Sequence, residues 1–133
     1  MMILMAAAAM AAGGADAVVG TWRTPGKNAI VEVSRCGASL CSKLLTSDGL
    51  KANPDMRDIN NKDTAVRGRR LMGLQLMNGL KWDGQSWSGG TIYNAEDGGT
   101  YKATVSAIDA DHLKLKGCIV WPLCKTQTWT RVR

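Results

Sequence analysis

Short runs of alternating apolar and polar residues make up most of this chain. Val31 and Val33 lie on one side of such a run, and a lysine separates Leu113 from Leu115 in another. An alternation of period two is typical of a β-strand with one buried face. Turn signals such as Asp83-Gly84 separate the runs. The pattern predicts eight strands, at residues 18–24, 28–35, 40–46, 71–82, 86–94, 99–108, 112–120 and 125–132.

The two ends of the predicted sheet carry residues that suggest a junction. The first strand contains Gly20-Thr21-Trp22, and the last one follows a Trp-Pro turn between two cysteines and ends near Arg131. We therefore expect the first and last strands to meet, which removes the exposed edges of the sheet. The predicted fold class is all-β, a small antiparallel up-and-down barrel of about eight strands. A barrel of this size is either filled by side chains or holds one small ligand.

One segment, residues 47–70, departs from the alternation. It is long, polar and rich in Asn, Asp and Arg. Asp63 is a suitable N-cap for one short helix over 63–67, so we expect a long loop or a short helix here. Long loops in compact domains are commonly functional. This loop ends in a basic cluster, and we expect it to cover a mouth of the barrel.

The first 17 residues have the pattern of a signal peptide. Residues 1–12 are almost entirely apolar but too short to cross a bilayer, and Ala15-Asp16-Ala17 is a small-x-small cleavage pattern. A buried N-terminal helix is the alternative, but the stretch has no polar face. We expect cleavage after Ala17, which leaves 18–133 as a single barrel domain in the periplasm or outside the cell. No later segment predicts a transmembrane anchor.

The charge of the chain narrows the choice of partners. It has 17 Lys and Arg against 11 Asp and Glu, a formal charge of +6. Outside the cytoplasm, this charge favours an anionic envelope surface over nucleic acid as a partner. Lys102, Lys114 and Lys116 alternate with apolar neighbours, and we interpret them as part of a solvated sheet exterior.

The four cysteines predict two disulfides rather than a metal site, because thiols in small exported domains oxidise. Three connectivities are possible. Turn-like residues lie between Cys36 and Cys41 and between Cys118 and Cys124, so we favour these two pairs, each within its own hairpin. Zinc is disfavoured because the spacings miss the usual short cysteine pair.

The chain resembles the bacterial family catalogued as domain of unknown function 2147 over essentially its whole predicted mature length. The resemblance implies export and a lipocalin-like barrel, but no established activity and no catalytic residues. Asn94-Ala95 stands where the family usually has Asp-Pro. The matching blocks are Gly20-Thr21-Trp22, Asp58-Ile59-Asn60-Asn61-Lys62-Asp63, Arg70-Leu71-Met72-Gly73-Leu74, Gly79-Leu80-Lys81, Gly89-Gly90-Thr91-Ile92-Tyr93-Asn94-Ala95-Glu96-Asp97-Gly98-Gly99-Thr100-Tyr101, Leu115-Lys116-Gly117-Cys118 and Gln127-Thr128-Trp129-Thr130-Arg131.

A wider resemblance to lipocalins suggests structural roles. In lipocalins the Trp of the first strand packs against an Arg from the last strand at the closed end of the barrel. By this resemblance, Trp22 and Arg131 form a cation–π contact. We also interpret Trp129 of the last strand as a structural residue. None of the three is expected to bind a ligand.

The sequence offers little catalytic chemistry. His112 is the only histidine, and it lies beside Asp109 and Asp111 in a predicted turn, where an exposed His is the simpler interpretation. Hydrolase, zinc-protease and phosphate-loop motifs are lacking. We therefore expect no enzyme activity, no catalytic residues, no metal and no cofactor.

Two functions remain. The first is to bind a small apolar or amphiphilic molecule inside the barrel. Arg70 would then lie at the rim and meet an anionic headgroup, and Trp82 and Trp87 would lie near the same mouth. The alternative is an envelope interaction or structural module with a filled barrel, which contacts an anionic surface or a protein partner. In that case these aromatic residues only fill the core. The expected walls depend on strand register, since a slip of one residue reverses them; they are Val33, Leu44, Leu74, Leu76, Tyr101, Val105 and Leu115.

Overall fold

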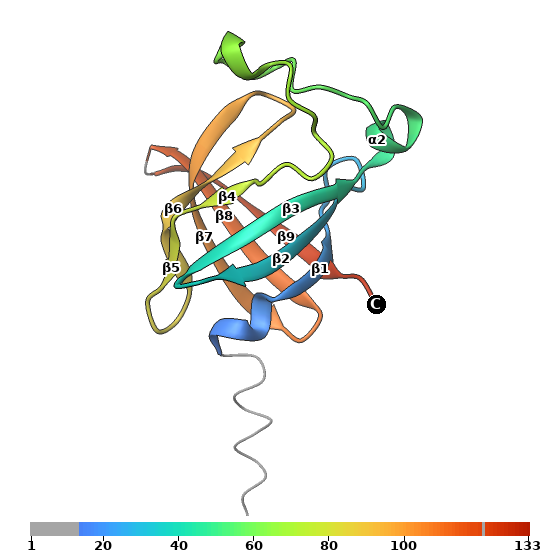
Figure 1. Ribbon diagram of the computed structural model, residues 1–133. Coiled ribbons are helices and arrows are strands. Elements are labelled where there is room, and N and C mark those ends of the chain that lie inside the picture. Colours follow the sequence, from blue (N-terminus) through green and yellow to red (C-terminus); the bar gives the residue numbers. More distant parts are fainter. Residues whose placement is uncertain (1–13, 121) are drawn as a thin grey trace, which may run out of the picture.

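The computed structural model describes residues 14–120 and 122–133, and these form one antiparallel sheet that closes into a barrel (Figure 1). Residues 1–12, on which the signal-peptide prediction depends, and Trp121 of the predicted Trp-Pro turn lie outside the described residues. The strands are β1 (Gly20–Arg23), β2 (Ile30–Cys36), β3 (Ser39–Thr46), β4 (Met77–Asn78), β5 (Leu80–Trp82), β6 (Trp87–Asn94), β7 (Gly99–Asp109), β8 (His112–Val120) and β9 (Leu123–Arg131).

The barrel closes through two junctions. β1 pairs with β9, with Trp22 opposite Arg131, and β6 pairs with both β5 and β7. β4 and β5 both pair with β6 and are two parts of one strand interrupted at Gly79, which has a φ of 74°. The described residues therefore form an eight-stranded up-and-down barrel, as predicted.

Seven of the eight predicted strands agree with the structure to within two residues at each boundary. The prediction of one continuous strand at 71–82 was wrong, because only β4 and β5 are strands within this range. Residues 71–76 still bond to β3, as Leu44 N donates to Leu74 O at 2.9 Å and Leu76 N to Ser42 O at 3.3 Å. Gly73, with a φ of 81°, turns the chain within this stretch. The alternation of side chains survives there without regular strand pairing.

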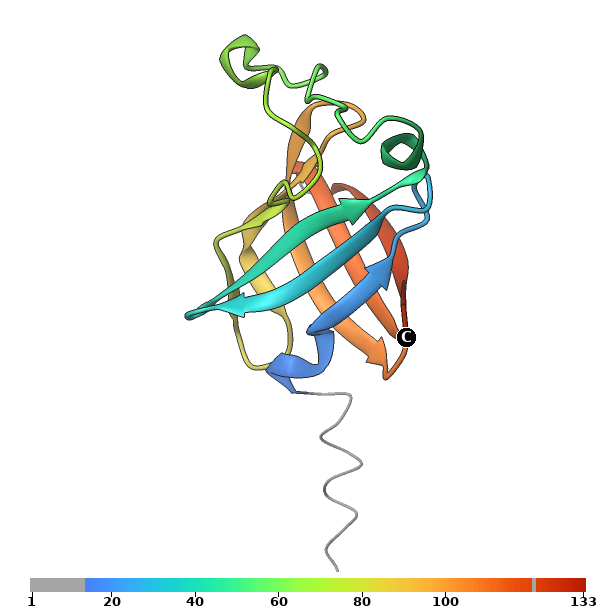
Figure 2. The ribbon, with the colours of Figure 1, turned by 45° about the vertical axis from the view of Figure 1, so that its right-hand side comes forward.

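The barrel has two different ends (Figure 2). At the η1 end lie the 3₁₀-helix η1 (Ala15–Val18) and the hairpin turns 37–38, 83–86 and 110–111. At the loop end lie the turn 24–29, the long segment 47–76, the turn 95–98 and the tip of the β8–β9 hairpin. The long segment contains the helix α2 (Asp48–Ala52) and the 3₁₀-helix η2 (Thr64–Val66). Asp63 Oδ1 accepts from Ala65 N at 3.0 Å, which confirms the predicted N-cap, whereas α2 was not predicted as a separate helix.

The predicted contact between the first and last strands is present at the η1 end. Trp22 is completely buried, its Nε1 donates to Val18 O at 2.9 Å, and the Arg131 guanidinium lies 4.3 Å from its ring centroid. Arg131 also donates to Val19 O at 3.0 Å and to Ala17 O at 2.9 Å. A Cβ at Gly20 would overlap Arg131 Nη1, so the glycine of Gly-x-Trp leaves room for the guanidinium.

The residues just before the barrel contact three of its side chains. Trp87 Nε1 donates to Ala15 O at 2.9 Å, Arg35 Nη1 lies 2.7 Å from Asp16 Oδ1, and Arg131 Nη2 donates to Ala17 O. Cleavage after Ala17 stays a prediction. A cut there would remove these three contacts from the η1 end.

Both predicted disulfides are formed. Cys36–Cys41 joins β2 to β3, with Cα atoms 5.8 Å apart. Cys118–Cys124 joins opposite positions of β8 and β9, with Cα atoms 4.0 Å apart. Each bridge therefore lies within one hairpin, as the short sequence separations suggested.

Candidate functional site

The inward-facing side chains differ in exposure along the barrel. Toward the η1 end they are at most 1% exposed, and there they fill the interior: Val33, Leu40, Leu80, Trp87, Val105 and Leu113. Toward the loop end five large aliphatic side chains are each 7–9% exposed, namely Leu44, Leu71, Leu76, Ile92 and Leu115. We call these five residues the loop-end cup. Val31, opposite Leu44, and Met77, opposite Ile92, are at most 1% exposed beside them. The interior is thus filled toward the η1 end, whereas five of its apolar side chains keep a small exposure toward the loop end.

All seven side chains expected on the barrel wall belong to the single core cluster or pack against it. Val33 and Val105 are fully buried, while Leu44, Leu76 and Leu115 belong to the loop-end cup. Leu74 and Tyr101 are half-buried beside them. The period-two alternation therefore identified the inward face, but it could not separate the filled depth from the accessible end.

The other three predicted site residues do not share one mouth. Arg70 is exposed in the long segment, where its Nη2 donates to Pro54 O at 3.2 Å and its Nε lies 3.6 Å from Asp55 Oδ1. Trp82 and Trp87 pack together at the η1 end, with ring centroids 5.8 Å apart. The expectation that these tryptophans lie near Arg70 was wrong, because β5 runs away from the loop end before the chain turns at 83–86.

Two polar residues at the loop end were missed by the sequence interpretation. Trp129, Gln127 and Lys125 are alternate residues of β9 and share a face; Trp129 is buried, and the other two are exposed. Gln127 is opposite Leu115 of the loop-end cup, and Lys125 is opposite Gly117. Lys125 and Gln127 therefore form a polar rim beside the cup. The spacing of two residues from Trp129 could have identified them.

Tyr101 adds a third polar group to this rim. It is opposite Ile92, and its hydroxyl donates to Asp97 Oδ2 in the β6–β7 turn. The hydrogen bond to Asp97, with some burial, raises the pKa of the Tyr101 phenol. The phenol therefore stays neutral, with its ring half-buried against the core and its hydroxyl outside.

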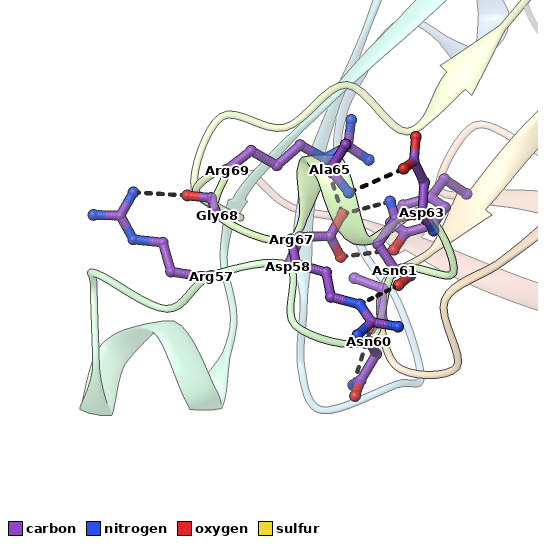
Figure 3. A network of polar contacts seen from close by, with 11 residues as sticks. Arg57, Asp58, Asn60, Asn61, Asp63, Ala65, Arg67, Gly68 and Arg69 are labelled. Atoms are coloured by element: carbon purple, nitrogen blue, oxygen red, sulfur yellow. Dashed lines mark hydrogen bonds and ion pairs between the residues drawn. The ribbon is translucent and has the colours of Figure 1, made fainter.

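A buried carboxylate anchors the long segment to the outer wall of the barrel. The side chain of Asp58 is fully buried, and it lies within a network of polar contacts in the long segment (Figure 3). Asp58 Oδ1 accepts from Tyr93 Oη at 2.6 Å, and Oδ2 accepts from Asn61 Nδ2 and Arg69 Nε, both at 2.9 Å. Burial alone raises the Asp58 pKa, but the hydrogen bonds from Tyr93, Asn61 and Arg69 outweigh it and hold the pKa below its usual value.

The same segment is fixed to the β6–β7 turn. Asn60 Nδ2 donates to Glu96 O at 3.1 Å, and a Cβ at Gly98 would overlap Asn60 O. Tyr93 is on the outer face of β6, because its neighbour Ile92 faces inward. Residues 58–69 are therefore fixed to the β6–β7 hairpin, and η2 extends beyond the loop end next to the β6–β7 turn (Figure 2). The flanking parts of the long segment cover the loop end, through buried Leu50 and Leu71 and the partly buried Met56.

Two hollows on the surface of the described residues lie outside the barrel. One hollow of about 510 Å³ lies under the long segment and is lined by polar groups that include Asn61, Arg69 and Gln75. A second, of about 360 Å³, lies over the β6 bulge, next to Gly90 and Lys102. Neither is lined by any of the seven expected wall residues. Because the side chains toward the η1 end fill the interior, a ligand inside the barrel would reach the cup.

The structure also places the single histidine and shows whether the described residues could form a metal site or a membrane-spanning helix. His112 Nδ1 lies 2.8 Å from Asp109 Oδ1 in an exposed turn. A backbone hydrogen bond from Asp111 and the contact with His112 lower the Asp109 pKa, so this pair stabilises the turn. Across residues 14–120 and 122–133, three or more His, Cys, Asp or Glu side chains nowhere gather as a metal site requires. In the same ranges, every helix is too short or too polar to span a bilayer.

We expect Tyr93 to report on the anchor at alkaline pH. Burial and the hydrogen bond to Asp58 raise its pKa from 10.0 to about 12. The folded state therefore favours the neutral phenol, and this part of the stability is present below pH 10 and lost as the pH rises to about 12. Urea unfolding at neutral pH and above pH 10 should show the wild type losing its advantage over Tyr93→Phe. An advantage that does not change with pH would contradict the raised pKa.

Comparisons with known proteins agree with this architecture. The model of a family described as an uncharacterized protein conserved in bacteria (DUF2147) matches residues 20–131. No curated protein matches the chain. Among solved structures it is similar to protein HP1028 from the human pathogen Helicobacter pylori, which belongs to the lipocalin family, with 24% identity and a TM-score of 0.77. The alignment covers 87% of this chain and 83% of that one, and at this identity it shows the fold alone.

Proposed function

The chain belongs to the bacterial DUF2147 family, and we propose that its lipocalin-like barrel binds the apolar part of a small amphiphile in the loop-end cup. The observation that carries this proposal is the residual exposure of five aliphatic side chains at one end of an otherwise filled interior. An apolar site with a few polar groups at its edge is the usual form of a small-molecule site.

The filled end limits what the cup accepts. Trp87, Val105 and Leu113 occupy the depth of the barrel, so the ligand would have a short or partly inserted apolar portion. The polar portion would remain at the rim, where Lys125 favours an anionic group and Gln127 offers hydrogen bonds. Arg70 was the cation expected at this rim, and its pairing with Asp55 makes it the weaker candidate.

We also propose that the protein acts in the periplasm or outside the cell and has no enzyme activity. The two hairpin disulfides support an oxidising compartment. The proposal of a binding role rather than catalysis is supported by the lipocalin-like fold and by the cup, whose large side chains are apolar.

A titration with a fluorescent fatty acid and its uncharged alcohol tests this function. Leu76→Trp should fill the cup and weaken both ligands by at least about tenfold, which corresponds to about 1.4 kcal/mol. Lys125→Ala should weaken only the fatty acid, by about fivefold, as expected for one partly exposed charge contact of about 1 kcal/mol. Leu45→Trp, on the outer face of β3, is the control for the added tryptophan, and Arg70→Ala tests the alternative cation.

The proposal requires saturable binding by the folded wild type. Far-UV circular dichroism must confirm that each variant keeps its β structure. Absence of binding at any soluble ligand concentration, or equal affinity for wild type and a folded Leu76→Trp variant, would show that the cup is not the site.

A further inference from the structure

The tip of the β8–β9 hairpin exposes three large apolar side chains to solvent. Ile119 is 69% exposed, Val120 58% and Leu123 63%. The structure thus leaves these three neighbouring residues outside the core while burying most of its other large aliphatic residues. Adjacent exposed apolar side chains of this kind mark contact sites. We call these three residues the hairpin tip.

The hairpin tip extends beyond the wall of the barrel. The pairing of β7 with β8 ends at Lys102 opposite Cys118, whereas β8 and β9 continue to pair as far as Val120 opposite Leu123. Beyond this point β7 continues to Gly99 in its pairing with β6, and the tip separates from β7 as a two-stranded extension toward the loop end (Figure 1). The Cys118–Cys124 disulfide joins the two strands at its base. Because the bridge already restrains the hairpin, little conformational entropy is lost when it binds.

The strands that carry the tip are strongly basic. From residue 112 to 133 the sequence has five Lys and Arg and no Asp or Glu. Lys102 is opposite Cys118, and Lys116 lies two residues before it. In the described part of the chain neither lysine takes part in an ion pair; the ion pairs that do form there involve other residues. An apolar tip is thus surrounded at its base by free positive charge.

We propose that the hairpin tip inserts into the interfacial region of a bilayer that contains anionic lipid. An extended strand rises about 3.3 Å per residue, so the two residues beyond Cys118 reach about 7 Å. This length matches the depth of about 5–10 Å at which interfacial apolar groups are buried. At that depth Lys102 and Lys116 would lie level with the headgroups, where anionic lipid attracts them. The proposal does not depend on a ligand in the cup.

Lipid is favoured over a protein partner because the charge on the strands that carry the tip has one sign and the charged side chains are long. Lysine stems lie along apolar surface while their ammonium groups stay in water, which suits a lipid interface. The hairpin tip and the polar rim of the cup are also at the same end of the barrel. A docked protein would therefore present its cup toward the membrane surface.

Vesicle sedimentation tests the proposal with the full folded chain and its disulfides intact. The vesicles are pure phosphatidylcholine, or phosphatidylcholine mixed with phosphatidylglycerol. The wild type should partition at least tenfold more strongly onto the anionic vesicles. The double change Ile119→Ser with Leu123→Ser should reduce that partition at least tenfold. Ile108→Ser, which alters an aliphatic residue that is 51% exposed at the η1 end, is the matched control and should change it less than twofold.

Two further arms separate insertion from other modes of contact. Lys102→Gln with Lys116→Gln should weaken binding to anionic vesicles, and added salt should weaken the wild type in the same way. Equal losses for the tip variant and Ile108→Ser, or full binding by the tip variant, would overturn insertion. Failure of the wild type to bind either kind of vesicle would also overturn insertion, whether or not the tip then binds a protein. Fatty-acid titration of the tip variant without vesicles should match the wild type, which separates this proposal from the function of the cup.

Discussion

Replacing Trp22 with alanine should lower the free energy of unfolding by about 4 kcal/mol, the usual cost of emptying a large buried aromatic site. Trp22 is fully buried, and its loss also removes the hydrogen bond to Val18 O and the contact with Arg131. Because Trp22 is opposite Arg131 at the junction of β1 with β9, the vacancy lies where the barrel closes.

Urea unfolding followed by far-UV circular dichroism is the suitable measurement, since the substitution changes the tryptophan fluorescence itself. Trp82→Ala is the matched control, because Trp82 is only half-buried, and it should cost clearly less. A loss below about 1 kcal/mol for Trp22→Ala would mean that the barrel does not depend on this junction.

Replacing Asp58 with alanine should cost about 3 kcal/mol. Removal of one partner of a buried ion pair typically costs about 3–5 kcal/mol, and the partly exposed Arg69 can recover some hydration. The change leaves Tyr93 Oη, Asn61 Nδ2 and Arg69 Nε without their shared acceptor. The long segment should consequently detach from the outer wall, and residues 58–69 should become sensitive to protease.

Acid provides an independent test of the same carboxylate. Because the Asp58 pKa is lowered in the folded state, its contribution is present above the usual pKa of about 4 and lost as the pH falls below that value. The difference in stability between wild type and Asp58→Ala should therefore shrink in acid. Asp63→Ala, which removes only the cap of η2, should cost no more than about 1 kcal/mol. Equal losses for the two aspartates would contradict a buried anchor at Asp58.

The sequence pattern predicted the parts of the fold that depend on neighbouring residues. Alternation located the strands and the inward positions such as Val33 and Val105, and short loops between cysteines predicted both disulfides. It did not predict that residues 71–76 would depart from regular strand pairing. The positive φ of Gly73 turns the chain there, and the alternation of side chains does not reveal this. It also placed Trp82 and Trp87 at the wrong end of the barrel. Successive strands run in opposite directions, so the end at which a hairpin lies depends on the number of strands and turns before it.

The buried anchor could not be predicted from local sequence. Asp58 lies in a polar stretch that reads as solvated, and its partner Tyr93 is 35 residues away. Only the tertiary structure brings the two together with Arg69. The accessible end of the barrel was hidden for a related reason: Val105 and Leu115 have the same pattern in the sequence, and their different exposure depends on what the other strands place around them.

The pairing of β1 with β9 also governs when the barrel can form. Trp22 and Arg131 are 109 positions apart, and Arg131 bonds to Ala17 across 114. Contacts of such long range slow folding, because closing a loop of this length costs conformational entropy before the contact stabilises anything. Until β9 has paired with β1, β1 has an unpaired edge that can join another chain. The risk of aggregation is therefore greatest during the time before β9 pairs with β1.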